Sequence, residues 1–295
     1  LRWYATSGRD LPWRRPPHRH DPYALLVAEV MLQQTQVERV LPRWRAWLER
    51  FPDFAALAAA PTAEVIRAWE GLGYNLRALR LQRTARAVVE CHGGRLPDDP
   101  QALLRLPGLG PYTAAAAACF AYGRDVPVLD TNVRRVLGRV IFGTRAAPEP
   151  ALRAAAAAVL PRGQGAAWHQ ALMDVGATLC RVRAPRCLLC PARPFCRAAP
   201  LLQRPGVAEA PARYTTPPYR GSRRYYRGRV VDALRALPDG HGVPLAELGP
   251  RVRPGFTAAD LPWLTERVQG LARDGLVALH GPAGEPAALR VSLPR

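Results

Sequence analysis

Four cysteines stand close together in the sequence and could hold a metal centre. Cys180, Cys187, Cys190 and Cys196 are spaced C-x6-C-x2-C-x5-C. Thiolates gathered in one compact loop can ligate an iron–sulfur cluster or a single metal ion. Structural zinc sites usually use two close cysteine pairs, and only Cys187 and Cys190 form one here. The spacing therefore favours a [4Fe–4S] cluster, with zinc as the alternative.

Two carboxylates occur where their surroundings would suit acid–base chemistry. Glu29 lies inside the apolar run 25–32, where burial would raise its pKa and suit it to act as a general acid. Asp130 follows Val128 and Leu129 and precedes a helical segment, which is typical of a helix N-cap. A carboxylate there faces whatever binds the helix end. An exposed Glu29 and a purely structural cap at Asp130 are the alternatives.

A glycine-containing turn could bind phosphate. Leu106–Gly110 has two glycines two residues apart, between the segment 101–104 and a helix expected from near Tyr112. Such a turn leaves backbone N–H groups bare at a helix N-terminus, where they can bind phosphate. By itself, this pattern is weak and favours a plain loop between helices over a phosphate site.

The charge balance indicates a polyanionic partner. The 295 residues carry 42 basic against 23 acidic side chains, a net charge of +19, and the pI is about 11. Nucleic acid is the commonest partner of such a chain, and a generally basic surface is the alternative. The sequence contains no lysine, so all the basic residues are arginine and no lysine can form a Schiff base.

Composition excludes several other classes of protein. Hydrophobic residues make up 48% and charged residues 22%, as in ordinary soluble globular proteins. The longest apolar run, 114–121, is far shorter than the roughly 18 residues that a membrane span needs. Residues 1–19 lack the apolar core of a signal peptide. The length predicts about two domains.

Apolar residues at helical spacing predict a mainly helical chain. Helices are expected at residues 24–32, 37–50, 62–69, 76–91, 113–122, 132–140, 151–160 and 168–179. Residues 201–226 are rich in Pro, Gly and Arg and are interpreted as a linker. Helices at 228–237, 245–248 and 261–274, followed by a hairpin of 277–280 with 288–293, would form a small winged-helix module.

Taken together, these residues resemble the MutY-type adenine DNA glycosylases of the helix–hairpin–helix superfamily. The resemblance runs from about Trp3 to Ala199, two thirds of the chain. It rests on the four cysteines and on Leu11–Arg14, Ala28–Thr35, Gly71–Tyr74, Leu106–Gly110, Val128–Asp130 and Gln170–Asp174.

The resemblance implies a mainly α, two-lobed helix–hairpin–helix DNA glycosylase with an iron–sulfur loop, extended by a small C-terminal winged-helix-like α/β module. Residues 1–22 and 127–200 would form the iron–sulfur domain. Residues 23–126 would form a six-helix barrel with the hairpin. A linker, 201–226, would lead to the winged-helix-like domain, 227–295. The cluster would be structural, and its loop would present arginines to phosphates.

The activity that the resemblance implies is base excision repair, namely hydrolysis of the N-glycosidic bond of adenine mispaired with 8-oxoguanine or guanine. The target base must leave the stack, because its reactive atoms are buried in a duplex. Glu29 would protonate adenine N7. Asp130 would stabilise the oxocarbenium-like sugar, or bond to it briefly, before water attacks. Tyr112 and Asn132 would support this centre.

Residues that would contact DNA follow from the same resemblance. Trp13, Arg14 and Gln170 would line the pocket for the flipped base. The hairpin would bind phosphate through the backbone N–H groups near Gly108 and Gly110.

A wedge would fill the gap left by the base and probe the opposite base; its residues would be Gln34, Leu72 and Tyr74.

Related bifunctional glycosylase–lyases carry a lysine where Tyr112 stands. The chain is therefore predicted to be a monofunctional glycosylase.

The sequence departs from the family at its C-terminal end. Family members usually carry a Nudix-like domain that recognises 8-oxoguanine, and Gly221–Arg295 is too short for one. Recognition of the damaged base would then rest on the wedge. Asn75 stands where a second tyrosine is common and Thr131 where glycine is common.

Two other functions compete with this one. A sister glycosylase would remove thymine or uracil opposite guanine, and Glu29 and Gln170 favour adenine instead. A non-enzymatic DNA-binding protein is disfavoured because both carboxylates are present. The expected partner is double-stranded DNA containing a mispaired adenine. A monomer is expected in the bacterial cytoplasm, associated with the nucleoid and away from membranes, because cysteine ligands suit a reducing compartment.

Overall fold

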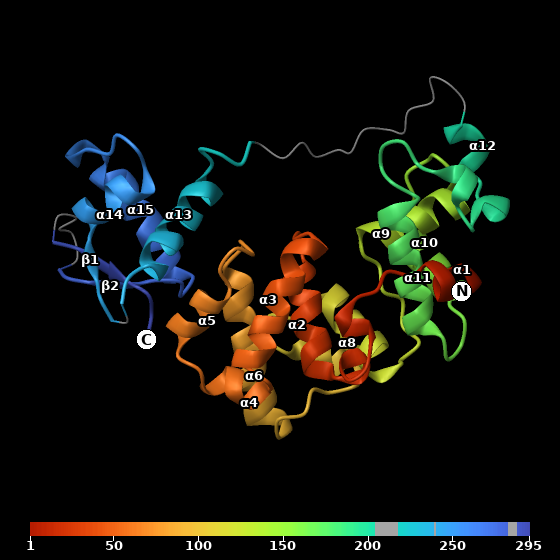
Figure 1. Ribbon diagram of the computed structural model, residues 1–295, viewed down its shortest axis with the longest axis horizontal. Coiled ribbons are helices and arrows are strands. Elements are labelled where there is room, and N and C mark those ends of the chain that lie inside the picture. The colour runs from red at the N-terminus through yellow and green to blue at the C-terminus, as the bar shows by residue number, and fades with distance from the viewer. Residues whose placement is uncertain (204–217, 239, 283–287) are drawn as a thin grey trace. The chain divides into compact units, whose positions relative to one another are not determined.

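The computed structural model describes residues 1–203, 218–238, 240–282 and 288–295, and helices dominate it (Figure 1). The chain forms two compact units. The first contains Leu1–Leu26, Leu96–Arg105 and the described part of Leu109–Thr215. The second contains Val27–Arg95, Leu106–Gly108 and the described part of Thr216–Arg295. Helix α2 (Pro22–Leu32) contributes to both. The mainly helical fold expected from the sequence is confirmed, and the four domain boundaries stay a prediction.

Helices of the first unit begin and end at residues suited to those places. Its longer helices are α8 (Pro111–Tyr122), α9 (Thr131–Leu137), α10 (Glu149–Ala158) and α11 (Gly165–Thr178). Its shorter helices are α1 (Arg2–Ser7), α7 (Pro100–Arg105) and α12 (Ala199–Leu202). Helix α8 ends at Gly123, whose left-handed backbone (φ 66°) terminates a helix at little cost. A π-helical turn, Gly138–Phe142, follows α9.

Short 3-10 turns complete the first unit. Two lie near its N-terminus, at Pro12–Arg14 and His18–His20. Two more lie among the cysteines, at Cys187–Leu189 and Arg193–Phe195.

The second unit begins with helices packed around tryptophan. These are α3 (Val37–Arg50), α4 (Phe54–Ala59), α5 (Thr62–Ala68) and α6 (Leu76–His92). Trp44, Trp47 and Trp69 are almost completely buried, and the rings of Trp47 and Trp69 meet edge to face with centroids 5.4 Å apart. Burying such large side chains contributes strongly to the stability of a core.

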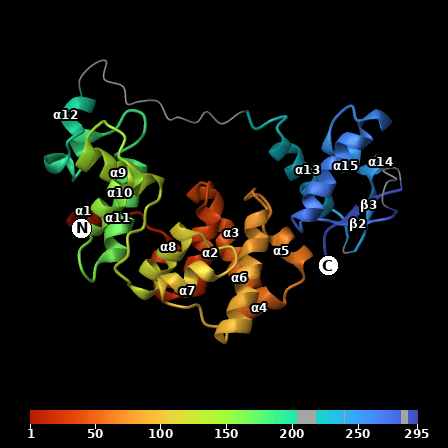
Figure 2. The same ribbon diagram turned by 180° about the vertical axis from the view of Figure 1, so that it is seen from behind.

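The C-terminal module of the second unit consists of three helices and a small sheet (Figure 2). The helices are α13 (Arg223–Arg235), α14 (Leu245–Val252) and α15 (Leu261–Arg273), with a 3-10 turn at Ala258–Asp260. The strands are β1 (Val243–Pro244), β2 (Ala278–His280) and β3 (Arg290–Ser292). They form an antiparallel sheet in the order β1-β3-β2, with Val291 opposite both Val243 and Leu279.

Several details differ from expectation. Helix α13 begins at Arg223, inside the segment interpreted as a linker, because Ser222 accepts a hydrogen bond from the Tyr225 N–H and caps the helix. Most of the expected linker, residues 204–217, lies outside the described residues. The sequence analysis does not predict helices α1, α4 and α12 or strand β1. None of the helices in the described ranges is long and apolar enough to span a bilayer.

The C-terminal module packs on α5 and α6. Ile66 and Leu79 belong to the same hydrophobic core as Val230 and Leu234 of α13. At the edge of this core, Arg235 donates to the Ile66 carbonyl at 3.0 Å. Arg67 donates in return to the Leu237 carbonyl at 2.9 Å, beyond the end of α13. Each arginine therefore satisfies carbonyls at the end of the other's helix.

Candidate active site

Asp130 is fixed at the start of α9 by two hydrogen bonds. Its Oδ1 accepts from the Val133 N–H at 2.6 Å, the geometry of an N-cap. Its Oδ2 accepts from Nδ2 of Asn132 at 2.8 Å. The carboxylate is half-buried at a helix N-terminus, where the helix dipole favours a negative charge. Asp130 and Asn132, both predicted site residues, are thus in direct contact.

Arg135 fixes the orientation of Asn132. Its Nη2 donates to Oδ1 of Asn132 at 2.7 Å and to the Gly176 carbonyl at 2.8 Å. Its Nε donates to the Cys180 carbonyl at 2.7 Å. Because Arg135 takes the amide oxygen, the amide nitrogen faces Asp130. One guanidinium therefore joins the carboxylate site to the backbone of the first cysteine.

Gly176 allows α11 to approach Asn132 closely. A Cβ atom at Gly176 would lie 2.5 Å from Cβ of Asn132, far inside van der Waals contact. Glycine in a helix interior costs about 1 kcal/mol relative to alanine. This close approach explains its presence, because any side chain would displace Asn132.

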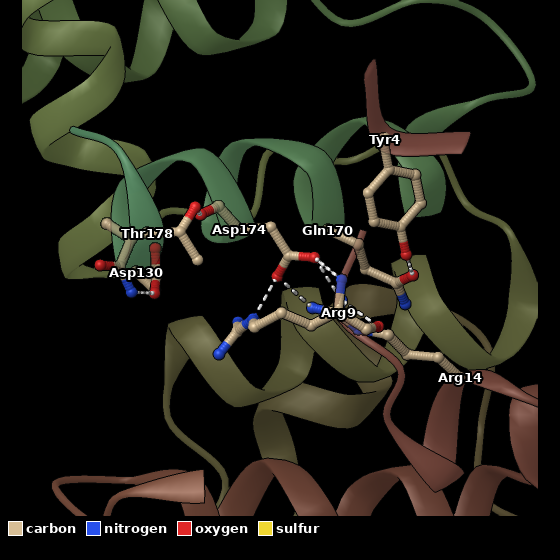
Figure 3. Close-up of polar contacts among 8 residues, drawn as sticks. Tyr4, Arg9, Arg14, Asp130, Gln170, Asp174 and Thr178 are labelled. Carbon is tan, nitrogen blue, oxygen red and sulfur yellow. Dashed lines mark hydrogen bonds and ion pairs between the residues drawn. The ribbon is translucent and has the colours of Figure 1, made fainter. Parts of the chain in front are cut away.

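Asp174 of α11 gathers two arginines from the N-terminal segment (Figure 3). Its side chain is fully buried. Arg9 donates Nε and its backbone N–H to the carboxylate at 2.7 and 2.8 Å, and Arg14 donates Nη1 and Nη2 at 2.8 and 3.1 Å. Burial alone would raise the pKa of Asp174, but the hydrogen bonds and charges of Arg14 and Arg9 outweigh it and hold the pKa below its usual value. Arg14, predicted to line the base pocket, is thereby held in place.

Gln170 lies one turn before Asp174 on the same helix. Its Oε1 accepts from the Tyr4 hydroxyl at 2.6 Å (Figure 3). Burial raises the pKa of Tyr4, so its hydroxyl stays a donor. Tyr4 also lies beneath the Arg14 guanidinium, 5.9 Å from the ring centroid. The predicted pocket residues Arg14 and Gln170 therefore share Tyr4 as a neighbour. The third predicted pocket residue, Trp13, is buried, with 3% of its surface exposed.

His169 supports the chain just before Asp130. It is 1% exposed. Its Nε2 accepts from the Val128 N–H at 3.0 Å, and its Nδ1 lies 2.8 Å from the Gly165 carbonyl, to which it must donate. Burial lowers the pKa of His169, more than the Gly165 hydrogen bond and the charges of Asp130 and Asp125 raise it. The neutral ring therefore holds the segment that leads to Asp130.

The four clustered cysteines line one small cavity. Val136, Arg139 and Leu179 line it as well. Arg139 is 3% exposed and donates Nη1 to Sγ of Cys180 at 3.3 Å. No cysteine forms a disulfide. Within the described ranges, no group of three or more His, Cys, Asp or Glu side chains is arranged to hold a metal ion.

Burial raises the pKa of two of these thiols. For Cys187, burial is the largest cause, and the neighbouring Cys180 and Cys196 add to it. For Cys190, burial is again the largest cause, partly opposed by a hydrogen bond from the Ala192 backbone. The thiols therefore lie close enough to influence each other's ionisation.

Glu29 belongs to the second unit. It lies in the last half of α2 and is 8% exposed. The sequence predicted a buried carboxylate at this position, and the structure shows one.

Arg77 of α6 holds the turns that carry the predicted wedge. It is 6% exposed, and its Nη1 donates to the carbonyls of Val30, Met31 and Gln33 at 2.6 to 2.9 Å. Its Nη2 donates to Leu72 at 3.0 Å and to Gly73 and Thr35 nearby. Burial lowers its pKa to about 10. One guanidinium thus ties the end of α2 to the segment Gly71–Tyr74.

The predicted wedge residues differ in exposure. Gln34 and Tyr74 have positive φ angles of 55° and 46° and are exposed, Tyr74 by 41%. Leu72 is 3% exposed and packs inside the unit. In this conformation, Gln34 and Tyr74 face solvent and Leu72 does not.

The hairpin is anchored on α6. Gly108 has φ 91°, and a Cβ there would lie 2.9 Å from the Arg80 carbonyl oxygen. The Thr84 hydroxyl donates to the Pro107 carbonyl at 2.6 Å. Gly110 is the N-cap of α8, and Tyr112 lies in the first turn of that helix. Only glycine fits this turn at position 108.

Several supporting residues were not found from the sequence. They are Tyr4, Arg9, Arg77, Arg135, His169 and Gly176. A glycine inside a helical pattern is a usable signal for close packing, which would have marked Gly176. The arginines carry no such signal, because the partners of Arg77 and Arg135 are mostly backbone carbonyls and the partner of Arg9 is Asp174, which is distant in sequence.

Comparison with known proteins identifies the family. Residues 27–162 match the HhH-GPD superfamily base excision DNA repair protein family. The adenine DNA glycosylase of Mycobacterium tuberculosis (strain CDC 1551 / Oshkosh) is 43% identical over 275 residues, which cover 91% of this chain and 84% of that protein. That of Mycolicibacterium smegmatis is 45% identical over 237 residues, covering 80% and 78%. The chain belongs to the adenine DNA glycosylase family. It is therefore a DNA N-glycosylase of base excision repair.

Solved structures share the fold of this adenine DNA glycosylase family member. A thermostable thymine-DNA glycosylase is 31% identical with a TM-score of 0.63, covering 68% of this chain and 93% of that one. An endonuclease III–DNA covalent intermediate is 23% identical with a TM-score of 0.60, covering 69% and 93%, and shows the shared fold alone.

The close approach at Gly176 predicts a defect in excision. Gly176→Ala should push Asn132 away from Asp130 and lower the single-turnover rate of base release by about 10- to 100-fold, as displacements near 1 Å do. Gly138→Ala is the matched control, since nothing lies within 4 Å of a Cβ there. An unchanged rate for Gly176→Ala would show that the placement of Asn132 does not matter for the chemistry.

The buried His169 predicts a pH-dependent stability. Its lowered pKa means that its contribution is fully present above about pH 6.5, the ordinary histidine value, and is lost as pH falls below it. His169→Gln should therefore make the fall of the thermal midpoint between about pH 7 and 5.5 shallower. His92→Gln, at an exposed position, controls for the loss of a histidine. An equally steep fall in His169→Gln would contradict this role.

Proposed function

We propose that this enzyme hydrolyses the N-glycosidic bond of adenine mispaired with 8-oxoguanine or guanine. The observation that carries the proposal is the Asp130–Asn132–Arg135 arrangement, a carboxylate fixed at a helix N-terminus, in a chain 43% identical to a protein named adenine DNA glycosylase. Such a carboxylate can stabilise the positive charge that develops on the sugar as the base departs.

The two carboxylates divide the chemistry. Glu29, buried in α2, donates a proton to adenine N7, so that the bond from C1′ to N9 breaks with the electron pair leaving on the base. Asp130 stabilises the oxocarbenium-like sugar or bonds briefly to C1′. Water then adds to C1′ and loses a proton, which leaves an abasic site. Asn132 orients Asp130, and Tyr112 supports the centre from α8.

The remaining predicted residues hold the substrate. Trp13, Arg14 and Gln170 form the base pocket, and the Arg9–Arg14–Asp174 ion pairs and the Tyr4 hydroxyl support it by fixing two of these side chains.

The wedge and the hairpin act on the duplex. Gln34 and Tyr74 are exposed and can probe the opposite base, while Leu72 would have to leave the core to do so. The backbone near Gly108 and Gly110 binds phosphate.

No lysine is present to attack the sugar, and Tyr112 stands where related lyases carry one, which supports a monofunctional glycosylase.

We propose further that the four clustered cysteines bind a [4Fe–4S] cluster. Four thiols line one cavity, none is in a disulfide, and a guanidinium of Arg139 donates to one sulfur. Four cysteine ligands of this kind suit a cubane cluster. When bound, the cluster would cross-link the loop 180–196. Arg139 and Arg135 hold the start of that loop through the backbone carbonyls of Arg181 and Cys180.

A thymine or uracil glycosylase acting opposite guanine is the second candidate. It is favoured by the 31% identity to a thymine-DNA glycosylase structure with a TM-score of 0.63. This 31% identity is lower than the 43% identity to the adenine DNA glycosylase of Mycobacterium tuberculosis. The base that the enzyme releases distinguishes the two candidate functions.

Single-turnover base release tests the proposed substrate. Duplexes carrying one A·8-oxoG, A·G, T·G or U·G pair would be incubated with excess enzyme, with and without alkali. We expect adenine release, with strand breaks only after alkali. Asp130→Asn should abolish release and spare DNA binding, and Glu29→Gln should slow release by roughly 100-fold or more. Release of thymine or uracil instead would overturn the proposal.

Metal content tests the cysteine centre. The purified protein should contain iron and acid-labile sulfide at about four each per chain and show the visible absorption of an iron–sulfur cluster. Cys187→Ser should lose both, whereas Cys91→Ser, at an exposed cysteine outside the loop, should lose neither. One zinc per chain with no sulfide would contradict the assignment.

A further inference from the structure

A basic groove in the second unit joins the C-terminal module to the segment Gly71–Asn75. Its volume is about 970 Å³, and seven arginines but only two aspartates line it. Arg77 and Arg235 donate to backbone carbonyls of the segment Gly71–Asn75 and of α5. The other five are called the groove arginines and are Arg39, Arg80, Arg223, Arg224 and Arg227. Of these five, Arg39 also donates to a backbone carbonyl, that of Gly71.

The groove arginines come from two sides. Arg39 and Arg80 lie on α3 and α6, and both are exposed. The other three are contributed by α13, within its first five residues. Arg227 pairs with Asp274, and Arg223 lies 4.0 Å from Glu266, the limit of an ion pair. The acids therefore offset only part of the charge, and the groove suits a polyanion.

Arg224 links the two sides through aromatic rings. Its guanidinium lies 5.2 Å from the ring centroid of Tyr74 and 5.2 Å from that of Tyr219. It also donates a hydrogen bond to the Tyr74 hydroxyl. Tyr219 in turn meets Tyr225 of α13 edge to face, with centroids 5.5 Å apart. Tyr74, which has φ 46° and is 41% exposed, is thus held by a residue of the C-terminal module.

The module is fixed against this segment by further contacts. Arg235 donates Nη2 to Oδ1 of Asn75 at 3.0 Å, next to Tyr74 in the chain. The reciprocal bonds of Arg67 and Arg235 hold α5 and α13 together. The groove is therefore a preformed surface with two walls, one from each part of the second unit.

We propose that the C-terminal module is a DNA-binding element: the groove binds the sugar–phosphate backbone of the substrate duplex beside Tyr74, and Arg224 is a positioning residue for Tyr74. This inference rests on the proposed function in one respect, that Tyr74 faces DNA. Exposed guanidinium groups along one groove match the repeating phosphates of a duplex. The module would thereby take part in substrate binding.

The salt dependence of DNA binding tests the groove. Each phosphate contact contributes a slope of about −0.9 to the plot of log affinity against log salt. The double variant Arg80→Gln/Arg223→Gln of the intact chain should make this slope less negative by about two on a duplex without a mispair. Arg251→Gln/Arg295→Gln removes the same charge at exposed positions outside the groove and should change it by much less. Equal slopes for the two double variants would overturn the proposal.

A double-mutant cycle tests Arg224. Arg224→Gln and Tyr74→Ala should each weaken discrimination between A·8-oxoG and A·G duplexes, measured as a ratio of single-turnover rates. If Arg224 acts through Tyr74, the double variant should be no worse than the worse single variant. Arg224→Lys keeps the charge but lacks the planar stacking group, so it should resemble Arg224→Gln in the ratio. Effects that multiply in the double variant would overturn the positioning role.

Different results would contradict the proposed adenine excision and the proposed DNA-binding groove. If the wild-type enzyme releases no adenine from any duplex, the proposed function is wrong, and the salt slope on a duplex without a mispair still tests the groove. If adenine is released but Arg80→Gln/Arg223→Gln keeps the wild-type slope, the groove inference alone is wrong.

Discussion

Arginine side chains that are buried or half-buried close the ends of several helices in this protein. The last four carbonyls of any helix lack partners within that helix. Here Arg77 satisfies carbonyls at the end of α2, and Arg135 those at the end of α11. Arg67 and Arg235 do the same for α13 and α5. Arginine suits this task because its planar fork offers five donors, whereas lysine offers one rotatable ammonium.

The need to satisfy carbonyls at a helix end also shapes the catalytic region. Arg135 uses three donor directions at once, toward Asn132, the end of α11 and the backbone of Cys180. The amide of Asn132 therefore has one orientation, and the carboxylate of Asp130 has a fixed neighbour. Gly176 is needed because this arrangement brings α11 against Asn132. The Asp130–Asn132 site and the start of the cysteine loop at Cys180 are consequently joined by one set of hydrogen bonds within the first unit.

Much of the helical fold could be predicted from sequence, because apolar periodicity and capping residues act locally. Helix α3 was expected at residues 37–50 and occupies Val37–Arg50. Asp130 was expected as an N-cap and is one. The start of α13 was missed because one cap, Ser222, outweighed a composition typical of linkers.

Long-range interactions in the site could not be predicted. The roles of Arg77, Arg135 and His169 depend on carbonyls and N–H groups that are distant in sequence and carry no side-chain signature. Leu72 shows that a sequence motif does not determine the burial of a side chain either. Its place in a motif says nothing about whether its side chain is buried, and here it is.

The reciprocal bonds between Arg67 and Arg235 have a consequence for how the protein opens. Each guanidinium spans the end of the helix that carries its counterpart, so neither helix can fray without breaking the bonds that close the other. Ile66 and Leu79 add shared apolar burial to this link. The C-terminal module and α5 therefore belong to one cooperative folding unit rather than to two that melt separately.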